Sequence, residues 1–186
     1  MSAFAVAALL TASIVSAQTP AARAGAENAP VVVSVYADLD APQGAPAAVV
    51  ARVLLDRYPG RVAVHFHHRP ADGTVHAADA AVVAAAAQQR GWEMAELLLA
   101  NQGQRDPGAL SLMARMLELN LDAFAAAMAD PNAAAAVVQA DAEEVARLRL
   151  AADTVLVVNG EAVKTMTSEI ERRFGSLLGA PTDPSR

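Results

Sequence analysis

Residues 31–60 read VVVSVYADLDAPQGAPAAVVARVLLDRYPG, and the order of their apolar and polar residues decides the fold. Residues 31–37 are almost continuously apolar and β-branched, which is typical of a strand buried on both faces of a parallel sheet. A proline- and glycine-rich loop follows, and then an amphipathic helix that ends near Gly60. A second strand, RVAVHFH, begins at Arg61. The stretch therefore predicts a βαβ unit.

The loop DLDAPQGAP, residues 38–46, lies where open α/β sheets build their sites. At this place the carboxyl end of a strand meets a helix N-terminus whose N–H groups lack partners. The loop nevertheless contains no cysteine, serine, histidine or lysine. Because Pro46 cannot donate a backbone N–H, we expect the regular helix to begin with Ala45 as its N-cap and Pro46 as its first residue.

Length and charge predict one domain that does not bind nucleic acid, and the apolar segment of residues 1–17 predicts that it is exported. The chain has 186 residues, a hydrophobic content of 54% and a net charge of -6 without any basic run. Residues 1–17, MSAFAVAALLTASIVSA, form an apolar stretch that ends in small residues. We interpret it as a signal peptide cleaved after Ala17, which predicts a periplasmic or secreted protein. No later apolar stretch is long enough to predict a membrane span in the mature chain.

Cysteine is absent from the sequence. Structural disulfides, thiolate catalysis, zinc–thiolate sites and iron–sulfur ligation all require this residue. We therefore expect no thiol-based mechanism and predict no cofactor.

The rest of the chain adds a leader, a block of helices and a second group of strands. Residues 18–29 are small and polar without periodicity, so we expect a flexible leader and order that begins near Pro30. From about residue 74 to about residue 150 the apolar residues follow a helical period. Asp-Pro pairs at 106–107 and 130–131 are typical helix starts, and the block predicts four or five helices.

Residues 153–164, DTVLVVNGEAVK, predict a hairpin with a tight turn at Asn159-Gly160. Ser168 and Glu171 have the spacing of a capping box and predict the start of a last helix. The chain then ends in a loose tail over residues 180–186. The predicted order is β-α-β, a helical insert, then β-β-α.

This order resembles the DsbA-like branch of the thioredoxin superfamily, in which a helical domain is inserted into a thioredoxin fold. The resemblance covers residues 30–179 and implies an α/β, thioredoxin-like domain with its insert at about 74–150. The segments that carry it are VVVSVYADLDAP, LLDRYPGRVAVHFHHRP, VHAADAA, GWEMAELLLANQ, LELNLDAF and VLVVNG.

In that family the first strand leads into a C-x-x-C motif at the helix N-terminus, which lowers the pKa of the first thiol. Counted from the strand, the motif falls on Ala41, Pro42, Gln43 and Gly44. The family also places a cis-proline before the hairpin strand, and this position is Thr154 here. The resemblance thus implies a degenerate site without catalytic residues. The binding candidates along the remnant groove are Asp40, Pro42, Gln43, Asp153 and Thr154.

The function implied is that of a redox-inactive, DsbA-like protein of the cell envelope that binds an extended peptide or an envelope protein. An alternative is a glutathione-dependent enzyme on the same fold, because some relatives activate glutathione with a serine at the site loop. Here Ala41 occupies the loop and Ser34 lies in the middle of a strand. We expect the Ser34 hydroxyl to bond to nearby backbone. A third possibility is a surface used only for self-association.

The four histidines are His65, His67, His68 and His76. Strand alternation places His65 and His67 on one face of the sheet and His68 on the other. The sequence alone puts no acidic or thiol ligand beside them. We therefore interpret them as solvated or capped strand-end residues and predict no metal site.

Asp38, Asp40 and Asp153 would converge at the site loop in a thioredoxin fold. Two carboxylates can act as an acid and a base when burial separates their pKa values. No nucleophile is predicted beside them, and aspartates in turns commonly cap free N–H groups. We interpret them as caps and strand-end residues.

Overall fold

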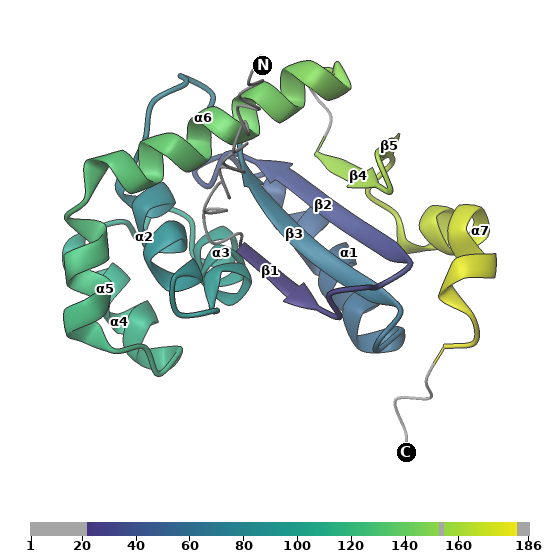
Figure 1. The fold of residues 1–186 in the computed structure, drawn as a ribbon, viewed down its shortest axis with the longest axis horizontal. Helices are drawn as coiled ribbons and strands as arrows, with labels where there is room; N and C mark the ends of the chain where they lie inside the picture. The colour runs from purple at the N-terminus through teal and green to yellow at the C-terminus, as the bar shows by residue number, and fades with distance from the viewer. Residues whose placement is uncertain (1–21, 153–154, 182–186) are drawn as a thin grey trace, which may run out of the picture.

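The computed structural model describes residues 22–152 and 155–181. A five-stranded sheet lies beside a block of helices, and further helices pack on its faces (Figure 1). The elements are β1 (Ala22–Gly25), β2 (Val31–Ala37), α1 (Gly44–Arg57), β3 (Val62–His68), α2 (Ala77–Ala86), α3 (Gly91–Ala100), α4 (Pro107–Met116), α5 (Leu121–Met128), α6 (Pro131–Leu148), β4 (Leu156–Val158), β5 (Glu161–Val163) and α7 (Thr167–Leu178).

The strands are arranged in the order β1-β3-β2-β4-β5. β2 and β3 are parallel, with Ser34 opposite His65, whereas β1, β4 and β5 run antiparallel to their neighbours. α1 connects the two parallel strands, so the predicted βαβ unit is confirmed. The predicted α/β order with a helical insert before the hairpin strands is confirmed as well.

The two faces of the sheet differ in how they are covered. On one face α1 packs with α3 and α7 over Val31, Val33 and Val35, which are all 0% exposed. On the other face α6 crosses in front of one end of the sheet (Figure 1). Tyr36 is buried beneath α6, but Ser34 remains partly exposed. The second face is therefore only partly closed.

The insert consists of α2 to α6, which agrees with the four or five helices expected. α2 is rich in alanine and is buried on nearly all sides, where it contacts α3, α5 and α6. Small side chains let helix axes approach closely while the interior stays densely packed. Trp92 and Met94 of α3 are fully buried and supply the larger volumes that alanine cannot. No described helix has both the length and the apolar character needed to cross a membrane.

The predicted flexible leader is wrong for residues 22–25, which form β1 on the edge of the sheet. The sequence ARAG has little intrinsic preference for a strand, and pairing with β3 decides its conformation. Gly91 allows this approach, because a Cβ at Gly91 would lie only 2.8 Å from Ala22 Cα. Order therefore begins well before Pro30.

Two helix starts also differ from the prediction. α1 begins at Gly44 rather than Pro46. Proline is tolerated as the third residue because the first N–H groups of a helix have no partner within it. α7 begins at Thr167 with Met166 as its N-cap, so the capping box of Ser168 and Glu171 is not formed.

Three other local predictions are confirmed. Asp106 and Asp130 accept hydrogen bonds from backbone N–H groups at the starts of α4 and α6. Asn159 and Gly160 adopt φ values of 49° and 82° in the hairpin turn. Asn159 also accepts a hydrogen bond from Val32 N–H at 2.8 Å, which fastens the hairpin to β2.

Candidate functional site

Asp38 organises the loop between β2 and α1. Its Oδ1 accepts a hydrogen bond from Asp40 N–H at 2.8 Å, and its Oδ2 accepts one from Ala71 N–H at 2.9 Å. Both carboxylate oxygens are thus engaged by backbone donors. The interpretation of Asp38 as a cap is confirmed.

Arg105 and Gln102 hold this loop against the end of α3. The Arg105 guanidinium pairs with Asp40 Oδ1 at 3.0 Å and donates to Leu39 O at 2.7 Å. Gln102 Nε2 donates to Ala41 O at 2.8 Å. The side chain of Arg105 is only 16% exposed, so these contacts are partly shielded from water. The loop is a rigid part of the surface, fixed by residues that sequence reasoning did not identify.

Gly44, which we expect at the second cysteine position of the family, is closely surrounded by packed side chains. Gly44 is buried, and a Cβ placed on it would lie 2.7 Å from Leu99 Cδ2 and 2.8 Å from Ala37 Cβ. Real Cβ atoms do not approach other atoms so closely, and the neighbours would have to move. The structure therefore has no space for a cysteine side chain at this position.

The remaining binding candidates divide into two groups. Pro42 and Gln43 are exposed at the start of α1, and the Asp40 side chain is 47% exposed. Asp153 and Thr154 lie outside the described residues. Their convergence with the loop therefore stays a prediction.

The histidines of β3 face opposite sides of the sheet, as predicted, but two of them are not solvated. His68 is 2% exposed, and its Nδ1 lies 2.7 Å from Asp79 Oδ1. His67 Nδ1 lies 2.8 Å from Asp141 Oδ1. The acidic partners could not be identified from the sequence around β3, because these carboxylates come from α2 and α6 of the insert. Of the two forms of the interpretation, solvated or capped, the solvated one is wrong for both residues.

Each aspartate bonds to a second group as well. Asp79 Oδ2 accepts a hydrogen bond from His76 N–H at 2.9 Å, and Asp141 Oδ2 accepts one from His68 N–H at 2.7 Å. Three of these four bonds fasten α2 and α6 to the end of β3, and the bond from His76 N–H caps the start of α2. A signal for the Asp79 pair was available, since an acidic residue inside the apolar helix AADAAVVAAA needs a buried partner.

His76 belongs to a more exposed cluster. Its Nε2 lies 3.1 Å from Asp72 Oδ1, and this hydrogen bond raises the pKa of His76. The backbone N–H of Thr74 donates to Asp72 and is the main cause that lowers the pKa of this carboxyl to about 2. Over the part of the chain that the structure describes, no group of three or more potential ligands is placed to hold a metal ion.

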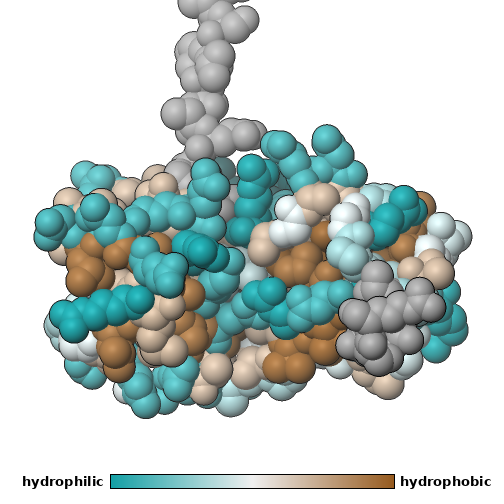
Figure 2. Space-filling model, turned by 90° about the horizontal axis from the view of Figure 1, so that it is seen from below, coloured by the Kyte–Doolittle hydropathy of each residue, from teal (hydrophilic) through white to brown (hydrophobic). Residues whose placement is uncertain are grey.

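The described surface carries few large apolar side chains. Leu112 and Met116, one turn apart on α4, are 57% and 62% exposed. On the face seen in Figure 2, apolar areas are separated by polar side chains. This face offers small apolar contacts within a polar surface.

Comparison with protein families places nearly the whole described domain in one group. A family model described as thioredoxin matches residues 17–173. Two curated relatives match over 117 residues, or 62% of this chain. They are the Na(+)/H(+) antiporters NhaA 3 of Salinispora tropica, 38% identical, and NhaA 1 of Salinispora arenicola, 36% identical. The match spans only 18% of the length of each antiporter.

Solved structures share the fold at low sequence identity. A thioredoxin-like oxidoreductase from Silicibacter pomeroyi is 20% identical with a TM-score of 0.66, over 84% of this chain and 91% of that one. BdbD from Bacillus subtilis is 19% identical with a TM-score of 0.68, over 86% and 93%. The thiol-disulfide exchange protein alpha-DsbA2 from Wolbachia pipientis is 14% identical with a TM-score of 0.71, over 86% and 87%.

Proposed function

This chain belongs to the thioredoxin family, and from that premise we propose that it is a redox-inactive, DsbA-like domain of the cell envelope that binds an extended peptide or an envelope protein. The main support for the proposal is the identity of the residues at the two positions where we expect the cysteines of the family. Ala41 and Gly44 stand where thiol chemistry needs sulfur, and Gly44 is enclosed by Leu99 and Ala37. The fold is retained while the means of electron transfer is gone.

The rigidity of the loop supports a role in binding. Arg105 and Gln102 fix the backbone of residues 39–41, while Pro42 and Gln43 stay exposed beside it. A surface that is already ordered loses less conformational freedom when a partner binds. This loop, together with Asp40, Asp153 and Thr154, is the proposed contact surface.

The antiporter relatives suggest one kind of partner. In both of them a segment similar to this chain is part of a sodium–proton antiporter. A membrane transporter of the envelope is therefore among the proteins that this domain would bind. The apolar segment 1–17 supports export to that compartment.

Redox inactivity is tested by the reduction of insulin in the presence of dithiothreitol. We expect the purified domain to leave the rate at the level of dithiothreitol alone. A DsbA-like protein with an intact C-x-x-C motif serves as the positive control. Turnover above that background would overturn the proposal.

Binding is tested with a photo-crosslinking amino acid placed at Gln43 and, as a matched control, at Glu143 of α6. Both side chains are exposed, but Glu143 lies on the insert and not on the loop. We expect a distinct crosslinked envelope protein from position 43 and none from position 143. Equal patterns from both positions, or none from position 43, would contradict a binding role for the loop.

Calorimetry separates this proposal from the glutathione-dependent alternative. We expect no heat of binding when millimolar glutathione is added to the domain. Saturable binding that weakens in Gln43→Ala or Thr154→Ala would favour the enzyme instead.

A further inference from the structure

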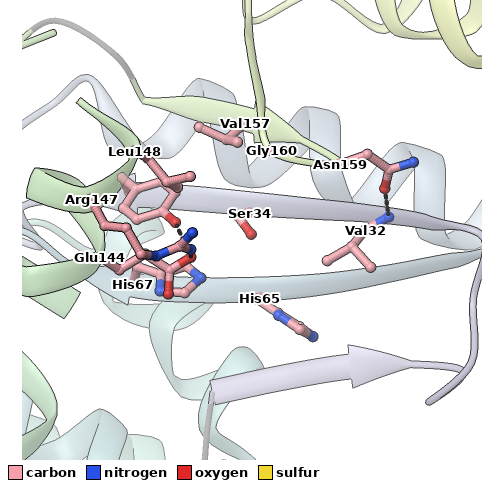
Figure 3. Close-up of a pocket in the computed structure, with 11 residues that line it drawn as sticks. Val32, Ser34, His65, His67, Glu144, Arg147, Leu148, Val157, Asn159 and Gly160 are labelled. Carbon is pink, nitrogen blue, oxygen red and sulfur yellow. Dashed lines mark hydrogen bonds and ion pairs between the residues drawn. The ribbon is translucent and has the colours of Figure 1, made fainter. Parts of the chain in front are cut away.

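A cavity of about 350 Å³ lies between α6 and the partly closed face of the sheet. Its floor comes from β2, β3 and β4, one wall comes from the end of α6, and the hairpin turn at Asn159 and Gly160 closes another side (Figure 3). None of the residues 38–44 lines it. The cavity is therefore separate from the loop that carries the degenerate motif.

The floor contains polar groups that have no hydrogen-bond partner among the residues that the structure describes. Ser34 and His65 are opposite each other in the parallel pair of strands, and both line the cavity. The expected bond from the Ser34 hydroxyl to nearby backbone is not formed, and neither ring nitrogen of His65 bonds to a described residue. Burial, with smaller contributions from His67 and Arg23, lowers the pKa of His65. The ring is thus neutral at pH 7 and offers one donor and one acceptor.

The wall of the cavity presents two opposite charges, Glu144 and Arg147, which lie one turn apart on α6 and pair with each other. Tyr36 donates to Glu144 Oε1 at 3.2 Å, and Arg147 donates to the same oxygen at 3.3 Å. Glu144 Oε2 has no bond to a described residue and remains available. The Tyr36 ring stacks on His67 at 4.4 Å between centroids, and Asp141 holds His67 in turn.

Apolar side chains complete the lining. Leu148 lies beside the charged pair, and Val32 and Val157 lie on the strands (Figure 3). A ligand there would meet apolar contacts on two sides and hydrogen-bonding groups on the others. This combination is typical of sites for small molecules, which are usually apolar cavities with a few well-placed polar groups.

We propose that this cavity binds a small zwitterion, of the size and chemistry of a free amino acid. Glu144 Oε2 would accept hydrogen bonds from the ammonium group, while Arg147 and the Ser34 hydroxyl would donate to the carboxylate. A simple anion would meet the Glu144 carboxylate, and a simple cation would meet the Arg147 guanidinium. Only a ligand with both charges matches both groups at once.

The test measures thermal stabilisation of the purified domain by each L-amino acid at millimolar concentration, followed by calorimetry on those that stabilise it. Each positive amino acid is compared with its decarboxylated amine and its N-acetylated acid. We expect at least one amino acid to raise the unfolding temperature and neither derivative to do so. Stabilisation by none, or equal stabilisation by either derivative, would overturn the proposal.

Variants locate the site. Glu144→Gln keeps an acceptor for Tyr36 but removes the charge, and Ser34→Ala removes the free hydroxyl. We expect each to weaken binding about tenfold or more, because a hydrogen bond to a charged group is lost. Glu143→Gln is the matched control, since Glu143 is exposed and does not line the cavity. Unchanged affinity in Ser34→Ala and in Glu144→Gln, or an equal loss in Glu143→Gln, would contradict the assignment.

Discussion

Gly44 packs against Ala37 so closely that a Cβ on Gly44 would lie 2.8 Å from the Cβ of Ala37. Leu99 crowds the same position from α3. The start of α1 is thus packed without room for a Cβ at residue 44 unless its neighbours move. The close approach of the helix to β2 and α3 depends on the absence of a side chain at this residue.

We expect Gly44→Ala to lower the free energy of unfolding by about 1–3 kcal/mol, because the added methyl group overpacks a buried contact. Gly175→Ala in α7 is the matched control, since a Cβ there meets nothing within 4 Å. It should instead stabilise the helix by about 0.5–1 kcal/mol. Urea denaturation measures both changes. A neutral or stabilising Gly44→Ala would show that the site has room for a side chain.

The bond between His68 and Asp79 predicts that Asp79 contributes more to the free energy of unfolding than an aspartate usually does. Asp79→Ala removes the partner of His68 Nδ1 and the acceptor of His76 N–H. We expect a loss of about 1–3 kcal/mol in unfolding free energy, because buried polar groups are left without partners. Asp122→Ala, at an exposed residue in the first turn of α5, should change stability by only about 0.5 kcal/mol. Similar losses in both variants would argue against a structural role for the buried pair.

Local patterns in the sequence predicted most of the fold. The β-branched run of residues 31–37, the Asp-Pro helix starts and the Asn159-Gly160 turn each act through neighbouring residues, so a single sequence is enough to recognise them. β1 could not be predicted in this way. Its conformation depends on pairing with β3 and on the absence of a side chain at Gly91.

The candidate site was predicted only in part, for the same reason. The expected places of Ala41 and Gly44 in the site loop follow from counting residues along the chain from the strand, which is local information. Arg105 reaches the loop from the connection between α3 and α4, and Asp141 reaches β3 from α6, so both come from parts of the chain that are distant in sequence. Nothing in their own surroundings in the sequence indicates a partner. The polar contacts of the insert therefore required the tertiary structure.

The opposite pKa shifts of His65 and His76 predict opposite effects of pH on their contributions to stability. Burial lowers the pKa of His65 below its ordinary value of 6.5, so on acidification the unfolded chain takes up this proton first. Its contribution to stability is present above pH 6.5 and is lost as the pH falls towards the folded pKa. The bond to Asp72 raises the pKa of His76, so its contribution is present below 6.5 and is lost as the pH rises through the folded pKa.

NMR titration of the imidazole protons measures both pKa values directly. We expect the pKa of His65 below 6.5 and that of His76 above it. In parallel, His65→Gln should reduce the loss of unfolding temperature on mild acidification, whereas His76→Gln should not. The reverse order of the two pKa values would contradict the burial of His65 at the cavity floor.

The contacts of Arg105 predict that this residue holds the loop between β2 and α1 in place. Its guanidinium bonds to Asp40 and to the carbonyl groups of Leu39 and Leu98. A lysine cannot reproduce this planar set of donors, so we expect Arg105→Lys to lower the unfolding free energy by about 1–3 kcal/mol. Hydrogen exchange should also quicken at the amides of Ala41 and Gly44, which bond within the loop.

Arg172→Lys is the matched control, because Arg172 is exposed on α7. It should change neither stability nor exchange in the loop. If Arg105→Lys leaves exchange over residues 38–44 unchanged, the rigidity of the loop comes from its own turns and not from the insert. In that case the insert would not preorganise the proposed contact surface, and the binding role would lose its main structural support.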